Sequence, residues 1–469
     1  MGFSLVLGQR GALANQRTDG KGETTRGPIW VESGMKCYFS GICPQMVPSA
    51  SLSRERFALL FAVMLVAASG NTAMQSLMPA IGRELGVADL WVAVAFSLSA
   101  VIWVLMAPYW ARRADHRGRR ALMRLGLYGF IASSLICGGI LAAGLHGLIP
   151  ATIVFVVFVF GRAIYGGWGS ASPPAVQAYI AARTEGEQRT AYLAALASSF
   201  GLGTIIGPAV APLFIFEPLG LSGPLIVFAG IGAAVLILVA LRLPDDTPGS
   251  AARGEVVDYP SMGGFLVGGR ERRDDGPAGG SGRLRWRDPR VLPWHIIGVV
   301  GGHGNAALLG VIGFLVIDRS GVPLAEAQQS IAIVLMAGAG ATLLAQWGLI
   351  PFLRLNPRQL VFWGLLIATA GTLQTGLAAS MYGITLGFAV ASAGFGLFRP
   401  GFTSGASLAV RPDEQNAVAG MVTSVNGVAY IAAPAVGVLL YGLWMPLPFL
   451  ATAVGLLSLA AWVWARVKG

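Results

Sequence analysis

Long apolar runs separated by short polar stretches dominate the chain from residue 57 onward. Most of the runs hold about 20 residues or more, which is the length that an α-helix needs to cross the hydrocarbon core of a bilayer. Runs of this length match helical spans rather than β spans. The pattern predicts twelve spans, near residues 57–80, 91–110, 121–144, 151–176, 190–213, 223–243, 293–317, 327–350, 359–379, 382–405, 416–440 and 446–465.

Two polar segments divide the chain. Residues 1–55 contain no long apolar stretch and are predicted to be a disordered cytoplasmic extension. Residues 244–292 are rich in Gly, Pro, Asp and Arg, and are predicted to be a flexible cytoplasmic linker. The predicted domains are therefore an N-terminal six-helix bundle (56–243) and a C-terminal six-helix bundle (293–469).

Composition supports an all-α integral membrane protein. Of the 469 residues, 55 % are hydrophobic and only 12 % are charged, whereas soluble domains carry about 25 % charged residues. No phosphate-binding loop and no metal-binding spacing of Cys or His is present in the sequence. We therefore expect neither an enzyme nor a cofactor or metal site.

The net charge of +11 does not indicate nucleic-acid binding, because the basic residues alternate in density between successive gaps. One set of gaps is rich in Arg, whereas the other set holds only Arg83 and Arg319. Basic loops resist translocation across the membrane. Both termini and the linker are therefore predicted to be cytoplasmic, in a multi-pass protein of the inner or plasma membrane.

The two predicted bundles are related by an internal repeat. A shift of 226 residues places Pro174 on Pro400 and Gly201 on Gly427, and a shift of 234 residues places Asn71 on Asn305. Because each half contains an even number of spans, both copies enter the membrane from the same side. Such a parallel repeat predicts two pseudo-symmetric bundles with a cavity between them.

The segment between the second and third spans, residues 111–120, combines one acid with several cations. It resembles the signature loop of the major facilitator superfamily, in which a Gly and three residues precede Asp-Arg/Lys-x-Gly-Arg/Lys-Arg/Lys. Such charges beside a helix end can hold two bundles together and release them. We therefore interpret the segment as a gating loop. The alternative is that its cations only fix the topology of the chain in the membrane. The matching residues are Asp115, Gly118, Arg119 and Arg120, whereas Ala111 and His116 depart from the pattern.

Two further elements resemble the same superfamily. Residues 162–166 of the fourth span are similar to its Arg-x-x-Gln-Gly element, with Tyr165 in the Gln position. The resemblance implies a part for Arg162 in proton or substrate handling; a packing Arg is the alternative. Gly203, Gly207 and Pro208 in the fifth span resemble the start of the antiporter element Gly-x-x-x-Gly-Pro-x-x-Gly-Gly, whose final Gly pair is replaced here by Ala211 and Pro212. Small residues four apart allow close helix packing and Pro bends a helix, and this element favours export.

Polar side chains in the middle of spans are candidates for the transport pathway: Asn71, Gln75, Arg162, His303, Asn305 and Asn426. The resemblance implies that Asn71 and Asn305 face the substrate, although amides also join helices to one another. An imidazole is the side chain suited to exchanging protons near neutrality, and His303 lies in the middle of a span. We therefore hypothesise that His303 relays protons, with Arg162 as a partner; a packed neutral His is the alternative.

The resemblance implies a monomeric secondary transporter that exports a small organic molecule in exchange for protons by alternating access. In this view the gating loop latches the outward-open state. An uptake permease for a metabolite such as an organic acid or a siderophore, and a non-transporting receptor or scaffold of the same fold, are the alternatives.

Overall fold

The computed structural model describes residues 52–181, 183–184, 186–244, 284–353, 355–411 and 414–467, and these residues are almost entirely helical. The extended pairing within this part of the chain is a single antiparallel bridge between Phe216 and Gly220. The predicted extension 1–55, except for its last few residues, and most of the predicted linker 244–292 lie outside the described residues.

The first half of the chain forms seven α-helices and two short 3-10 turns. Ser53 caps the first helix by accepting a hydrogen bond from the Arg56 amide at 3.3 Å. These elements are α1 (Arg54–Glu84), α2 (Asp89–Arg117), α3 (Arg119–Leu145), α4 (Ala151–Trp168), η1 (Gly169–Ala171), α5 (Ser172–Ala181), α6 (Gly186–Val210), η2 (Ala211–Phe214) and α7 (Gly223–Arg242).

The described residues of the second half also form seven α-helices, but here the second span is interrupted and not the fourth. A π-helical turn, η3 (Leu344–Leu349), joins α9 to the short α10. Asn356 and Gln359 form a reciprocal capping box at the start of α11. The helices are α8 (Leu292–Ser320), α9 (Leu324–Leu343), α10 (Ile350–Leu353), α11 (Pro357–Leu377), α12 (Met381–Leu408), α13 (Gln415–Leu443) and α14 (Leu447–Arg466).

The predicted membrane-spanning helices are present. Eleven described helices are long and apolar enough to cross a bilayer, and the shorter apolar helix Gly201–Phe214 occupies the place of the fifth predicted span. The fourth span is α4, η1 and α5 together, and the eighth is α9 followed by η3 and α10. The prediction of an all-α membrane fold is confirmed.

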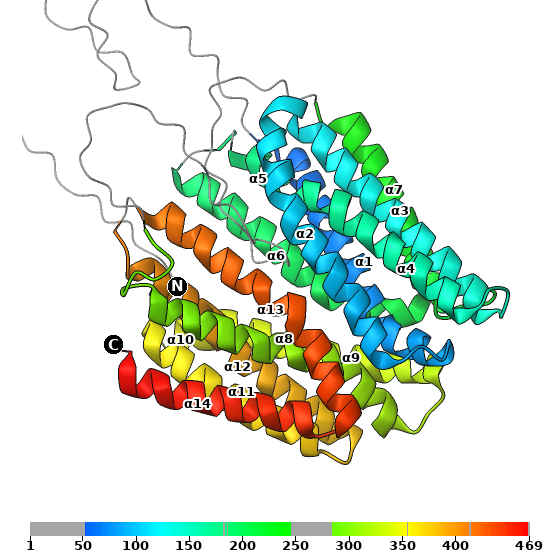
Figure 1. The fold of residues 1–469 in the computed structure, drawn as a ribbon. Coiled ribbons are helices and arrows are strands. Elements are labelled where there is room, and N and C mark those ends of the chain that lie inside the picture. The colour runs from blue at the N-terminus through cyan, green and yellow to red at the C-terminus, as the bar shows by residue number, and fades with distance from the viewer. Residues whose placement is uncertain are drawn as a thin grey trace, which may run out of the picture. The chain divides into compact units, whose positions relative to one another are not determined.

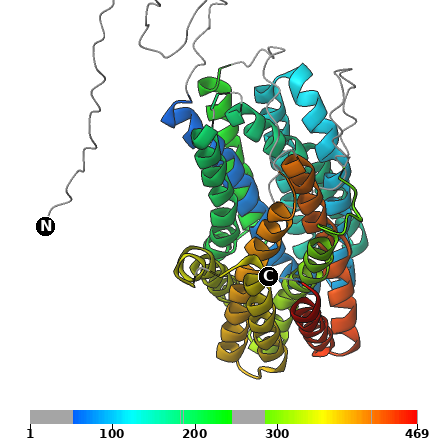
Figure 2. The same ribbon diagram turned by 90° about the vertical axis from the view of Figure 1, so that its left-hand side faces the viewer.

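The helices form two groups, α1–α7 and α8–α14 (Figures 1 and 2). The same neighbours recur in both groups. Helix α1 contacts α6 and α7, and α8 contacts α13 and α14 in the corresponding way. Likewise α4 contacts α2 and α3, while α12 contacts α9 and α11. The two bundles therefore share one internal arrangement, as expected of a parallel repeat.

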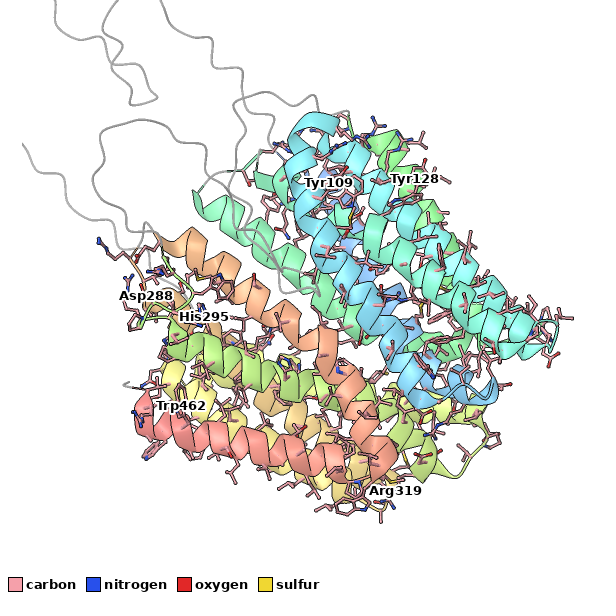
Figure 3. The ribbon with its side chains drawn as sticks, in the orientation of Figure 1. Tyr109, Tyr128, Asp288, His295, Arg319 and Trp462 are labelled. Carbon is pink, nitrogen blue, oxygen red and sulfur yellow. The ribbon has the colours of Figure 1, made fainter. Side chains whose placement is uncertain are left out.

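The molecule has two ends along the helix axes. The linker end carries the first residues of α1 and α8 and the last residues of α7 and α14; the distal end carries the last residues of α1 and α8. Figure 3 shows Asp288, just before α8, and Arg319, at the end of α8, on these opposite sides. The halves meet where α1 contacts α8 and α9, α2 contacts α13, and α6 contacts α9.

Candidate functional site

The predicted gating loop is largely helical. We expected residues 111–120 to connect two spans, but α2 continues through Arg117 and α3 begins at Arg119. Gly118 alone separates the two helices, with a φ of 83° that favours glycine. Arg113 and Arg117, the charged side chains described in this last part of α2, are exposed, which is compatible with a helix that extends past the membrane. The side chain of Asp115 lies outside the described residues.

The two arginines that follow Gly118 contact their own half of the molecule. Arg119 is buried, and Arg120 donates a hydrogen bond to the carbonyl oxygen of Ala240 in α7. This contact ties α3 to α7 within one bundle. The role of the segment as a gate between bundles stays a prediction.

Arg162 lies in α4 and is 4 % exposed. Its Nη2 donates a 3.0 Å hydrogen bond to Oδ1 of Asn71, and its Nη1 lies 3.6 Å from the sulfur of Met74, both in α1. The guanidinium also lies 4.7 Å from the ring centroid of Phe96 and 5.2 Å from that of Tyr165. The structure thus brings together two of the predicted pathway residues, Asn71 and Arg162.

The buried charge of Arg162 has neutral partners. An amide oxygen, a thioether and two aromatic faces stabilise a cation less than a carboxylate does. Its Nε is buried without a hydrogen-bond partner among the described residues. None of the contacts that the structure describes for Arg162 involves His303, so the suggested pairing of these two residues stays a hypothesis.

The predicted packing element of the fifth span lies against α1. A Cβ atom added at Gly207 would overlap the Ser69 carbonyl and the Thr72 hydroxyl, and one added at Gly203 would lie 2.6 Å from the Ala68 side chain. Thr72 also donates a 3.1 Å hydrogen bond to the Gly203 carbonyl. Pro208 lies inside α6, and the helix gives way to η2 after Val210.

The polar residues of the second half are partly exposed. His303 places Nδ1 2.7 Å from the carbonyl oxygen of Val299, one turn earlier in α8. Asn305 donates a 3.4 Å hydrogen bond to the hydroxyl of Tyr430 in α13. Asn426, on the same helix as Tyr430, and Gln75, in α1, are also partly exposed.

Arg399 in α12 was missed by the sequence interpretation. It lies far from both ends of its span, and its charge interacts electrostatically with Tyr430 of α13. A signal was available, because an Arg inside an apolar run is as unusual here as it is at Arg162.

A group of charged residues at the distal end was also missed. Arg83 of α1 bonds both carboxylate oxygens of Asp89 in α2, at 3.1 and 2.7 Å, and forms an ion pair with Asp318 of α8. The hydroxyl of Tyr441 in α13 donates to Asp318. We call these four residues the distal cluster. The sequence identifies Arg83 only as one of the two cations in its set of gaps, because its partner Asp318 lies 235 residues away.

The halves also bond through neutral groups at this end. Gln328 of α9 donates a buried 3.0 Å hydrogen bond to the hydroxyl of Ser76 in α1. Close by, Gly313 of α8 packs against Pro79 of α1. A Cβ atom added at Gly313 would lie 2.7 Å from the Pro79 side chain. The side-chain hydrogen bonds described between the two halves thus lie near the distal end.

A comparison of most of the sequence with known families identifies the family of this chain. The sequence model of the Major Facilitator Superfamily matches residues 59–434. The chain belongs to this superfamily. With the spans described above, it is a multi-pass membrane protein.

Curated relatives resemble parts of the chain. A probable actinorhodin transporter of Streptomyces coelicolor is 26 % identical over 181 residues, which is 37 % of this chain and 29 % of the relative. A homologue of the multidrug resistance efflux pump PmrA, from Lactococcus lactis, is 29 % identical over 163 residues, covering 35 % of this chain and 36 % of the relative. The matches span about a third of each relative.

A solved structure supports the fold across nearly the whole chain. The crystal structure of a bacterial homologue of the human lysosomal transporter Spinster, in an inward-facing and unoccupied conformation, superposes with a TM-score of 0.66. It is 13 % identical and covers 87 % of this chain and 95 % of that chain. At this identity the likeness establishes the arrangement of helices and nothing about the cargo.

Proposed function

We propose that this protein is a secondary active transporter that exports a small organic molecule by alternating access. The observation that carries the proposal is the position of the contacts between halves. Two bundles of the same internal arrangement are bonded to each other near the distal end by Arg83–Asp318 and Ser76–Gln328. Rocking about such an interface would expose the space between the bundles to one side at a time. Both curated relatives are named for transport, and the name of the second, an efflux pump, favours export.

The linker end is proposed to face the cytoplasm of a plasma-membrane protein. Arg113, Arg117, Arg119 and Arg120 lie at this end, and the distal end carries Arg83 and Arg319. This asymmetry supports the assignment, because basic segments are retained on the cytoplasmic side. In that orientation, the bonds at the distal end are those expected of an inward-facing state, and we propose that the protein works as a monomer.

Proton exchange is the proposed energy source, with His303 as the relay. The described spans carry no acidic residue far from their ends, whereas His303 lies midway along α8 and is partly exposed. An imidazole exchanges protons in the physiological pH range. His303→Gln should therefore reduce proton-driven flux between pH 5.5 and 8 while leaving counterflow of the cargo intact. Full proton-driven flux in this variant would remove His303 from the mechanism.

The test of the function is substrate-dependent proton movement in proteoliposomes. Purified protein is reconstituted with a pH-sensitive dye inside, and candidate cargoes are added under an imposed cargo gradient. Antiport predicts that protons move opposite to the cargo. Movement of both in the same direction would indicate an uptake permease, and cargo binding with no flux would indicate a receptor.

A further inference from the structure

The interiors of the described spans carry positive charge and no negative charge. Among the described spans, the acidic residues lie in the first or last turns of their helices, as Glu55, Asp89 and Asp318 illustrate. Two charged side chains lie deeper, more than two turns from the ends of their spans: Arg162 and Arg399. A cation at such depth is costly in hydrocarbon and marks a functional position by default.

Each half supplies one of these cations from its fourth span, at positions that the internal repeat does not superpose. Asn71 and Asn305, which the internal repeat superposes, lie on the first helix of each half, and an Arg lies on the fourth span of each half. In the first half, Arg162 bonds Asn71 directly. In the second half, Asn305 donates a hydrogen bond to the Tyr430 hydroxyl, and the charge of Arg399 interacts electrostatically with the same Tyr430.

The group in the second half is the more accessible of the two. Arg399, Tyr430 and Asn305 come from α12, α13 and α8, and all three are partly exposed. From Arg399 a partly exposed polar stripe continues one turn at a time through Thr403 and Ser407, toward the linker end of α12. The stripe connects the linker end of α12 with the position of Arg399. Arg162, in contrast, is covered by its amide and aromatic neighbours in this conformation.

We propose that the cargo is an organic anion, a carboxylate or sulfonate, and that the Arg399, Tyr430 and Asn305 group binds it. The inference rests on the proposed transport function and names its substrate class. A guanidinium with a neighbouring hydroxyl and amide offers several donors to the oxygens of one anionic group. The second cation, Arg162, adds to the positive potential of the interior and disfavours a cationic cargo, because like charges in a poorly solvated site repel strongly.

The proposal is tested with two probes that share one ring system and differ in charge: 2-naphthalenesulfonate and trimethyl(2-naphthyl)ammonium. Binding to the purified full-length protein is measured by calorimetry, and flux by counterflow in proteoliposomes. Arg399→Gln removes the charge, and Arg399→Lys keeps the charge without the planar donor fork. Arg319→Gln, an exposed position at the distal end, makes the same charge change away from the group.

The wild-type protein should bind the sulfonate at least about tenfold more tightly than the ammonium, a preference of about 1.4 kcal/mol. Arg399→Gln should lose this preference, Arg399→Lys should restore part of it, and Arg319→Gln should keep it. Unchanged sulfonate affinity in Arg399→Gln would overturn the assignment of the group. Transport of the ammonium but not the sulfonate would overturn the anionic cargo while leaving the transport function standing. If neither probe is transported, the result would count against both the anionic cargo and the proposed transport function.

Discussion

At the scale of single residues, the distal cluster decides how the two bundles are held together. Arg83 bonds one carboxylate of its own half, Asp89, and one of the other half, Asp318. All three side chains remain partly exposed, with 22 %, 23 % and 27 % side-chain exposure. Ion pairs at exposed sites contribute about 1 kcal/mol or less, which is enough to bias an equilibrium between two conformations.

We predict that Arg83→Gln shifts the protein toward a state open at the distal end. A loss of about 1 kcal/mol corresponds to a roughly fivefold change in the ratio of the two states. The measurement is the labelling rate of Ser76→Cys by a membrane-impermeant maleimide, in a chain whose native Cys residues are replaced. Ser76 is buried at the interface between halves.

Asp318→Asn should act like Arg83→Gln, and the double variant should add little, because both single changes remove one interaction. Arg319→Gln serves as the control of equal charge change. Labelling that is as slow in Arg83→Gln as in Arg319→Gln would show that the pair does not hold the distal end.

At the scale of elements, α1 and α6 approach each other through the glycines of α6. The Gly207 position faces the backbone of Ser69 and Ala73, which cannot move aside as a flexible side chain could. Gly201, one turn and a half earlier on the same helix, has open space where a side chain would begin. The two positions therefore form a matched pair for testing the packing.

Gly207→Ala should destabilise the protein by about 1–3 kcal/mol, the usual cost of inserting a methyl group into a closely packed contact. Gly201→Ala should be neutral or slightly stabilising, because Ala favours helix more than Gly does. Thermal unfolding of the purified variants measures both. Equal melting temperatures for the two variants would contradict the close approach of α1 and α6.

A second element-scale contact fixes the start of α8 to the start of α13. Arg290 bonds Asp288 and Glu414 with distances of 2.8–3.1 Å. Hydrogen bonds from Arg290 lower the pKa of both carboxyl groups. A lowered folded-state pKa stabilises the fold at a pH above the ordinary carboxyl range, and this contribution is lost as the pH falls through the folded-state pKa.

Arg290→Gln should therefore lower the melting temperature at pH 7, and the difference from wild type should shrink as the pH falls below about 4. Arg287→Gln, at a neighbouring exposed position, should have no such pH-dependent effect. A difference between Arg290→Gln and wild type that stays constant from pH 7 to pH 3.5 would mean that the ion pairs are not its cause.

The elements themselves were predictable because hydropathy is a local property. The length of each apolar run limits the span, and the twelve predicted ranges coincide with the helices to within a few residues at most ends. The end of α2 is the exception: charged residues 111–117 continue the helix, and charge does not by itself end a helix outside the membrane.

The contacts between the two halves could not be predicted from the sequence. Nothing local pairs Arg83 with Asp318 or Ser76 with Gln328, because these pairs depend on how two bundles meet.

At the scale of the whole molecule, two bundles with the same internal arrangement are bonded to each other near the distal end. Gln328 and Ser76 bond there at 3.0 Å, from α9 and α1 of different halves. If the halves rock, this bond breaks in each transport cycle, because cargo has to leave or enter at the distal end. If the protein does not alternate between states, the bond can persist without consequence.

The most direct test is a reversible cross-link at this position. Ser76→Cys and Gln328→Cys are introduced together in a chain without its native Cys residues, and cargo flux is measured before oxidation, after it and after reduction. The account predicts that the cross-link stops flux and that reduction restores it, while each single variant is unaffected by oxidation. Full flux through the cross-linked protein would contradict alternating access between these two halves.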